Sequence, residues 1–194
     1  MTSSPVKEDQ SEAPNPELLQ AAYNAYAQAV LYAKASAQAT REGLGVDLSR
    51  TRPHVDAMLQ CLRRDASALV SILKLKDHGE YAHTHGVNVC AYALIFGLRL
   101  DLPDGTLQNL GLAALLHDIG NSELPASILE KPGRLTPEEY RVVMTHPVVG
   151  FRLLAASGEL AADVGRAVLE HHERYRGQGY PKGLAGDQIS PLAR

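Results

Sequence analysis

Histidine is the residue type through which this sequence could do chemistry, since the chain has eight histidines and only two cysteines. Imidazole and carboxylate side chains without thiolates favour a divalent first-row metal such as iron, manganese or zinc. One set of such residues falls at or near predicted helix ends or faces, mostly beside a glycine or proline. Its members are His85, His117, Asp118, His146, His171 and His172. We take them as candidate metal ligands.

Two adjacent pairs in this set suit a centre with two metals. At a frayed helix end the side chains of His117 and Asp118 can converge, and a carboxylate can bridge two cations with its two oxygens. The pair His171-His172 could likewise serve two neighbouring metals. Such cations, about 3.5–4 Å apart, activate a shared water and hold a phosphoryl group for in-line displacement. The chemistry indicated is metal-assisted hydrolysis, most naturally of a phosphoester.

A structural interpretation of the same histidines stays open at this point. A lone histidine on an apolar helix face is usually a hydrogen-bonded core residue, and His117 shares a face with Leu110 and Ala114. His-Asp dipeptides also arise by chance, so composition and spacing alone favour neither interpretation. The other histidines are interpreted as structural or surface residues: His54, His78 and His83.

The elements that must position these side chains are predicted to be helices. Apolar residues recur at spacings of three, four and seven, and no run of alternating β-branched residues indicates a strand. Asn15, Pro16 and Glu17 form a helix start, and Thr136 with Glu139 forms a capping box. Longer helices are expected at about 16–41, 53–76, 82–98, 107–118 and 160–172.

Pro147 marks a boundary between two further helices. A short helix follows the capping box, and the proline ring disfavours helical geometry at His146, so a new helix is expected to start there. Residues 123–135 are expected to form a loop. The predicted fold class is all-α. The helix that starts at His146-Pro147 is predicted to have an apolar face formed by Val148, Phe151, Leu154 and Ala155.

Composition places the chain among ordinary globular proteins, with 45% hydrophobic and 21% charged residues. A net charge of −3 gives no reason to expect a nucleic-acid polymer or a membrane surface as a partner. Residues 1–14 are polar, carry no secretory signal and are expected to be a disordered tail. The default location is then the cytoplasm, which suits the two cysteines, because Cys61 and Cys90 cannot form a disulfide framework.

The chain from about residue 73 to residue 194 resembles the HD-GYP family, a branch of the HD superfamily of metal-dependent phosphohydrolases. Two blocks carry most of the resemblance: LLHDIG at 115–120, and HHERYRGQGYPKGL at 171–184, which contains Gly179-Tyr180-Pro181. Further matches are YAHTHGVNV at 81–89, Pro125, ILEKPGRLTPEE at 128–139, His146-Pro147 and Gly150. The resemblance predicts an N-terminal helical region at 15–76 and an HD-GYP-like domain at 77–194.

The resemblance implies an HD-domain-like helical bundle with an N-terminal helical extension and two divalent metal ions, iron or manganese. It implies hydrolysis of the bacterial second messenger cyclic di-GMP to the linear dinucleotide or to GMP. The implied metal ligands are His85, His117, Asp118, His146, His171 and His172. Asp118 would bridge the metals, and the loop at 177–186 would form a wall of the substrate site. The implied substrate-binding residues are Arg176, Gly179, Tyr180, Pro181 and Lys182.

Three departures from the family pattern bear on activity. Asn121 replaces the lysine expected beside the substrate phosphate, so this candidate catalytic residue supplies no positive charge there. Asp118 is the other candidate catalytic residue. An aspartate ligand expected after the GYP block is absent up to Arg194, which predicts a domain incomplete at its C-terminus. Apolar surface exposed there could be covered by the N-terminal helices, a second copy or a partner. Tyr81 stands one helical turn before His85, where three-metal members have glutamate, which favours two metals.

These observations leave three functions open. The first is an HD-GYP cyclic di-GMP phosphodiesterase with reduced turnover. The second is a degenerate HD-GYP module that binds nucleotide or a signalling partner without turnover. The third is another HD phosphohydrolase acting on a nucleotide, against which the GYP block argues.

Overall fold

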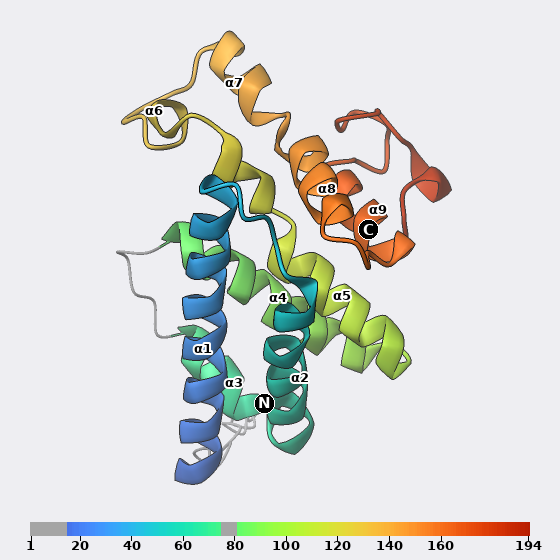
Figure 1. The fold of residues 1–194 in the computed structure, drawn as a ribbon. Coiled ribbons are helices and arrows are strands. Elements are labelled where there is room, and N and C mark those ends of the chain that lie inside the picture. Colours follow the sequence, from blue (N-terminus) through green and yellow to red (C-terminus); the bar gives the residue numbers. More distant parts are fainter. Residues whose placement is uncertain (1–14, 75–80) are drawn as a thin grey trace, which may run out of the picture.

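The computed structural model describes residues 15–74 and 81–194, and the regular structure in these ranges is helical (Figure 1). In chain order the elements are α1 (Pro16–Arg41), α2 (Leu48–Arg64), α3 (Ala66–Lys74), α4 (Tyr81–Arg99), α5 (Asp104–Leu116), η1 (Ile119–Glu123), α6 (Ala126–Leu129), α7 (Pro137–Val143), α8 (His146–Ala156), α9 (Ala162–Glu170) and η2 (Gly186–Gln188). The described residues form no strand, only an isolated bridge between Arg176 and Ala185. The all-α prediction is confirmed.

The first helix begins where its sequence predicts. The Asn15 side chain accepts a hydrogen bond from the Glu17 N–H at 2.8 Å, and Pro16 takes the first helical position. Such a cap satisfies a backbone donor that has no partner within the helix. The helix then packs along α2, α3 and α4, as the side-by-side α1 and α2 in Figure 1 illustrate. The N-terminal region therefore shares one hydrophobic core with the rest of the described chain.

The single helix expected at 53–76 is wrong, because the structure has two helices, α2 and α3, separated at Asp65. Asp65 has an extended backbone, and its carboxylate accepts hydrogen bonds from the N–H and the hydroxyl of Ser67 at 2.8 and 2.6 Å. An aspartate that bonds the chain two residues on favours a new helix start over continuation. Helix α2 also begins before Pro53, because Asp47 caps it by accepting from the Ser49 N–H at 3.0 Å.

Close backbone contacts hold together the elements that carry the candidate ligands. A Cβ on Gly86 would lie 2.8 Å from the carbonyl oxygen of Leu115, so α4 and α5 touch through their backbones. A Cβ on Gly120 would lie 2.1 Å from the oxygen of His146 and 2.6 Å from the nitrogen of Gly150. Turn η1 therefore lies directly on α8. Any side chain at these two glycines would push the elements apart.

The buried face of α8 differs in part from the expected one. Its buried residues are His146, Pro147, Gly150 and Leu154. The expected apolar face is right for Leu154 and wrong for Val148 and Phe151, whose exposed fractions are 46% and 37%, and for the exposed Ala155. The face of α8 that packs on η1 is the one with Gly150, because the missing side chain lets the two backbones approach closely. The distribution of large apolar residues along α8 does not set this face.

Smaller elements agree with expectation to different degrees. The loop expected at 123–135 contains the short helix α6, and the helix expected at 160–172 is the shorter α9. The capping box is confirmed, with hydrogen bonds of 3.2 and 2.7 Å between Thr136 and Glu139. No described helix is both long and apolar enough to cross a membrane. The predicted tail at 1–14, His78, and the side chains of Tyr81 and His83 lie outside the described residues.

Replacing Gly120 by alanine tests the contact between η1 and α8. The added methyl group would overlap backbone atoms, so we expect Gly120→Ala to lower the free energy of unfolding by about 1–3 kcal/mol. Gly105→Ala in α5 is the matched control, because a Cβ there meets open space. Urea unfolding followed by circular dichroism measures both variants, and equal stability of the two would contradict the contact.

Candidate metal centre

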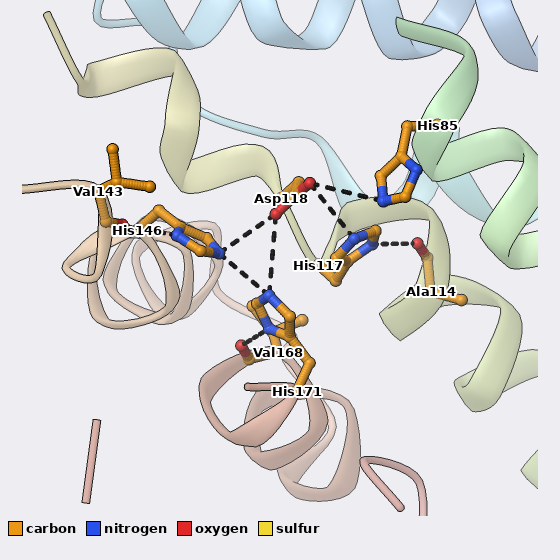
Figure 2. Close-up of polar contacts among 8 residues, drawn as sticks. All are labelled: His85, Ala114, His117, Asp118, Val143, His146, Val168 and His171. Carbon is orange, nitrogen blue, oxygen red and sulfur yellow. Dashed lines mark hydrogen bonds and ion pairs between the residues drawn. The ribbon is translucent and has the colours of Figure 1, made fainter. Parts of the chain in front are cut away.

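The candidate ligands come from elements that are distant in sequence and meet at one point (Figure 2). His85 lies on α4, His117 directly follows α5, and Asp118 directly precedes η1. His146 is the first residue of α8, and His171 directly follows α9. The predicted convergence of imidazoles around one carboxylate is therefore confirmed.

Three of these histidines are held by the same kind of backbone contact. The Nδ1 atoms of His117, His146 and His171 each lie 2.7 Å from the carbonyl oxygen of the third residue before them. Those carbonyls belong to Ala114, Val143 and Val168. Each is in the last turn of a helix, where carbonyls have no partner within the helix. Because a carbonyl oxygen only accepts, Nδ1 carries the proton and Nε2 of the neutral ring keeps its lone pair.

The carboxylate of Asp118 lies between two pairs of ring nitrogens (Figure 2). Its Oδ1 is 3.2 Å from Nε2 of His146 and 3.8 Å from Nε2 of His171. Its Oδ2 is 3.4 Å from Nε2 of His117 and 3.9 Å from Nε2 of His85. Each oxygen thus faces its own pair of imidazoles, which is the arrangement that a bridging carboxylate needs.

The donor atoms fit metal ions. The Nε2 atoms of His146 and His171 are 3.0 Å apart, and both carry lone pairs in the neutral rings. Two lone pairs facing each other at this distance repel unless a proton or a cation lies between them. The ligand atoms form two groups, and within each group they lie within 4.8 Å of one another. The α8–α9 group consists of Asp118, His146, His171 and His172, and the α4–α5 group consists of His85, His117 and Asp118.

Burial and neighbouring charge set the protonation of these side chains. Burial opposes ionisation of Asp118, yet its interactions with His117 and His146 hold its pKa well below the usual range. Burial likewise opposes the charged form of His117, but the adjacent carboxylate raises its pKa overall. Burial and neighbouring imidazoles lower the pKa of His171 to about 3, and they also lower that of His172. At neutral pH the His171 ring can therefore bind a cation without first losing a proton.

The segment containing Gly179-Tyr180-Pro181, here called the GYP loop (residues 173–188), closes one side of the centre. The Tyr180 ring stacks on His172 with ring centroids 4.6 Å apart, and the Tyr180 N–H donates to the His172 carbonyl at 3.2 Å. Burial and nearby Tyr140 raise the pKa of Tyr180 to about 12, so the phenol is protonated near neutral pH. A Cβ on Gly179 would lie 2.4 Å from the Cα of Glu173, so the fold-back requires glycine.

The other predicted substrate residues lie on the loop surface or in an adjoining groove. Arg176 and Lys182 are exposed on the GYP loop. A groove of about 290 Å³ between the loop, α7 and α8 is lined by Arg141, Met144, Thr145, Val148, Val149, Tyr180 and Pro181. Asn121 lies in η1, where its Oδ1 is buried without a hydrogen-bond partner among the described residues.

Sequence reasoning misses two glutamates that flank the histidine pair, Glu170 and Glu173. Glu170 is only 2% exposed, and its carboxylate pairs with Arg166 at 3.1 Å and accepts from the Ser190 N–H at 2.6 Å. It thereby ties the chain beyond the GYP loop to α9. The sequence does give one signal for these residues: Glu170 and Glu173 stand on either side of His171-His172.

Residues 65–194 match the family model described as an HD domain. The chain belongs to the HD domain family. A cyclic di-GMP phosphodiesterase of Pseudomonas aeruginosa is 43% identical over 154 residues, covering 79% of this chain and 37% of that protein. The cyclic di-GMP phosphodiesterase response regulator RpfG of Xanthomonas campestris is 37% identical, covering 68% of this chain and 35% of that protein. A 3'3'-cGAMP-specific phosphodiesterase of Vibrio cholerae is 34% identical, covering 73% of this chain and 30% of that protein.

A solved structure has the same fold. The HDG"Y"P protein Bd1817 from Bdellovibrio bacteriovorus matches with a TM-score of 0.75 at 21% identity, covering 96% of this chain and 59% of that chain. The family match, the curated relatives and this common fold together confirm the resemblance of the sequence to the HD-GYP family. The chain spans about a third of the length of the curated relatives above, 37%, 35% and 30%. The division into regions at 15–76 and 77–194 stays a prediction.

Because Asp118 belongs to both groups of ligand atoms, its removal should affect metal binding most. We expect Asp118→Ala to lose the bound metal, and His85→Ala, which changes the α4–α5 group alone, to retain part of it. His54→Ala is the control, since this described histidine lies in neither group. Elemental analysis of desalted protein gives metal per chain, and the melting temperature should rise on metal addition only where metal binds. Unchanged metal content in Asp118→Ala would remove the carboxylate from the centre.

Proposed function

We propose that this chain hydrolyses a phosphodiester bond of a cyclic dinucleotide, with cyclic di-GMP as the substrate. The observation that carries the proposal is the Asp118 carboxylate, whose two oxygens face separate pairs of imidazole nitrogens. Such a donor set suits displacement at phosphorus, where negative charge develops on oxygen. The names of the curated relatives support the substrate class, since they record cyclic di-GMP or 3'3'-cGAMP.

In this proposal the centre takes two divalent cations, iron or manganese, one in the α8–α9 group and one in the α4–α5 group. When bound, such ions supply Lewis acidity and offset the negative charge of the phosphate. The two groups share Asp118, so this residue keeps the two cations together. His172 completes the α8–α9 group and also carries the stacked Tyr180 ring.

The chain's own groups orient the substrate beside this centre. The protonated phenol of Tyr180 donates a hydrogen bond to a phosphate or base oxygen. Gly179 and Pro181 shape the wall of the site, with Pro181 in the groove beside α8. Arg176 and Lys182, both exposed, place positive charge where the second phosphate of a cyclic dinucleotide approaches.

Asn121 favours a second candidate function, a module that binds the dinucleotide or a signalling partner without turnover. Its amide brings no positive charge to the reaction centre, so stabilisation of the transition state is weaker than with lysine. The buried, unpartnered Oδ1 of Asn121 can accept a hydrogen bond from a group that enters with the substrate. In the first candidate function, a phosphodiesterase with reduced turnover, Asp118 and Asn121 are the catalytic residues.

Direct assay of the purified chain tests the proposal. With Mn²⁺ or Fe²⁺ and cyclic di-GMP we expect the linear dinucleotide or GMP, detected by liquid chromatography and mass spectrometry. A parallel reaction with 3'3'-cGAMP measures the preference between the two cyclic dinucleotides. Tight binding of cyclic di-GMP by the metal-loaded chain without any product would instead establish the binding module.

Restoring a lysine at position 121 tests the role of Asn121. A cation beside the phosphate should stabilise the developing charge, so we expect Asn121→Lys to raise kcat by about tenfold or more. Ser127→Lys is the control, because it adds the same charge at an exposed position of α6. Steady-state kinetics with cyclic di-GMP compare them, and equal kcat values would place residue 121 outside the reaction centre.

Other expectations from the sequence stay predictions. They are the cytoplasmic location, a homodimer or signalling partner, and the lack of a nucleic-acid polymer or membrane partner.

A further inference from the structure

Packing alone does not hold the GYP loop. From Glu173 to Gln188 no residue is buried, whereas Ile189 and Ser190 directly after it are. The loop nevertheless carries Tyr180, whose ring stacks on His172 at the metal centre. Hydrogen bonds must therefore supply the order that a hydrophobic core supplies elsewhere in the described chain.

Glu173 provides two of the hydrogen bonds that close this loop, beside the bond from the Gly186 N–H to the Tyr175 carbonyl at 2.9 Å. Its Oε1 accepts from the N–H of Lys182 at 2.7 Å, and its Oε2 accepts from the N–H of Leu184 at 2.9 Å. Each carboxylate oxygen thus takes one backbone donor, from residues nine and eleven positions further along the chain. Bonds from N–H groups to an ionised carboxylate are stronger than bonds between neutral groups.

One of these bonds holds the chain two residues after Tyr180. The N–H of Tyr180 is bonded to the carbonyl of His172 at 3.2 Å, and only Pro181 separates Tyr180 from Lys182. The chain is therefore held at Tyr180 by His172 and at Lys182 by the adjacent Glu173. The Tyr180 ring, at the first of these positions, lies 24° from parallel to the His172 ring.

We propose that Glu173 is a positioning residue for substrate binding: its carboxylate holds the GYP loop so that Tyr180 stays over His172 and meets the cyclic dinucleotide. Glu173 belongs to neither group of candidate ligand atoms, although it adjoins His172 in sequence. It acts through Tyr180 and leaves the metal ions in place. The inference rests on the proposed phosphodiesterase function, which it extends to the loop that selects a large substrate.

Kinetics with a large and a small substrate separate this role from a purely structural one. Glu173→Gln keeps the size of the side chain and removes its charge and one acceptor. We expect kcat/KM for cyclic di-GMP to fall by about tenfold, mainly through KM. Hydrolysis of bis(p-nitrophenyl) phosphate, which needs the metal centre and does not span to the loop, should be retained, as should metal content. Glu159→Gln is the matched control, because Glu159 is exposed and outside the loop.

A second readout needs no turnover. The chain has no tryptophan, so Tyr180→Trp introduces a single fluorescent reporter at the stacked position. In this background Glu173→Gln should make the reporter more accessible to acrylamide quenching, and Glu159→Gln should leave it unchanged. If wild-type protein hydrolyses no cyclic dinucleotide, the proposed function fails while this measurement still decides the role of Glu173.

Several results would overturn the inference. They are loss of metal from Glu173→Gln, an equal loss of activity on both substrates, unchanged kinetics on both, or unchanged quenching. Circular dichroism shows whether the helices persist. If Glu173→Gln does not fold, Glu173→Asp keeps the charge but shortens the reach to the two N–H groups, and it should show the same split between substrates.

Discussion

The carboxylate of Asp118 is the group on which the rest of the centre depends. Its side chain is half-buried, and an ionised carboxylate that loses part of its hydration is unfavourable unless other groups compensate. The ring nitrogens that face both oxygens carry lone pairs in the neutral rings, so protons or cations between these nitrogens and the oxygens would provide that compensation. The fold must therefore deliver the ends of α5 and α9, the start of α8 and a face of α4 to this one group.

Carbonyl groups at helix ends orient three of the imidazole rings. The last carbonyls of a helix lack partners within it, and His117, His146 and His171 each use one as the acceptor for Nδ1–H. One hydrogen bond thus satisfies an orphan carbonyl, selects the tautomer and directs the opposite nitrogen inward. Ligands placed in the middle of a helix would find no such free acceptor, which explains why these histidines stand at helix boundaries.

The two sides of the centre are held by different forces. On the α4, α5 and α8 side, backbones touch at Gly86 and Gly120, and the surrounding residues are close-packed. On the side of the GYP loop, the carboxylates of Glu170 and Glu173 hold returning chain by its N–H groups. In the proposed function, a close-packed candidate metal centre is thereby combined with a substrate wall whose shape depends on a few polar contacts.

Local signals in the sequence predict several features correctly: the helix capped by Asn15, the capping box at Thr136, the all-α class and the candidate ligand types. The sequence did not show that Asp65 divides α2 from α3, because the same apolar spacing continues through the break. Nor did it show which face of α8 is buried. Tertiary structure alone decided how the imidazoles divide between the oxygens of Asp118, because that division depends on distances between elements. Those distances follow from contacts such as Gly120 against α8, which join segments far apart in the chain.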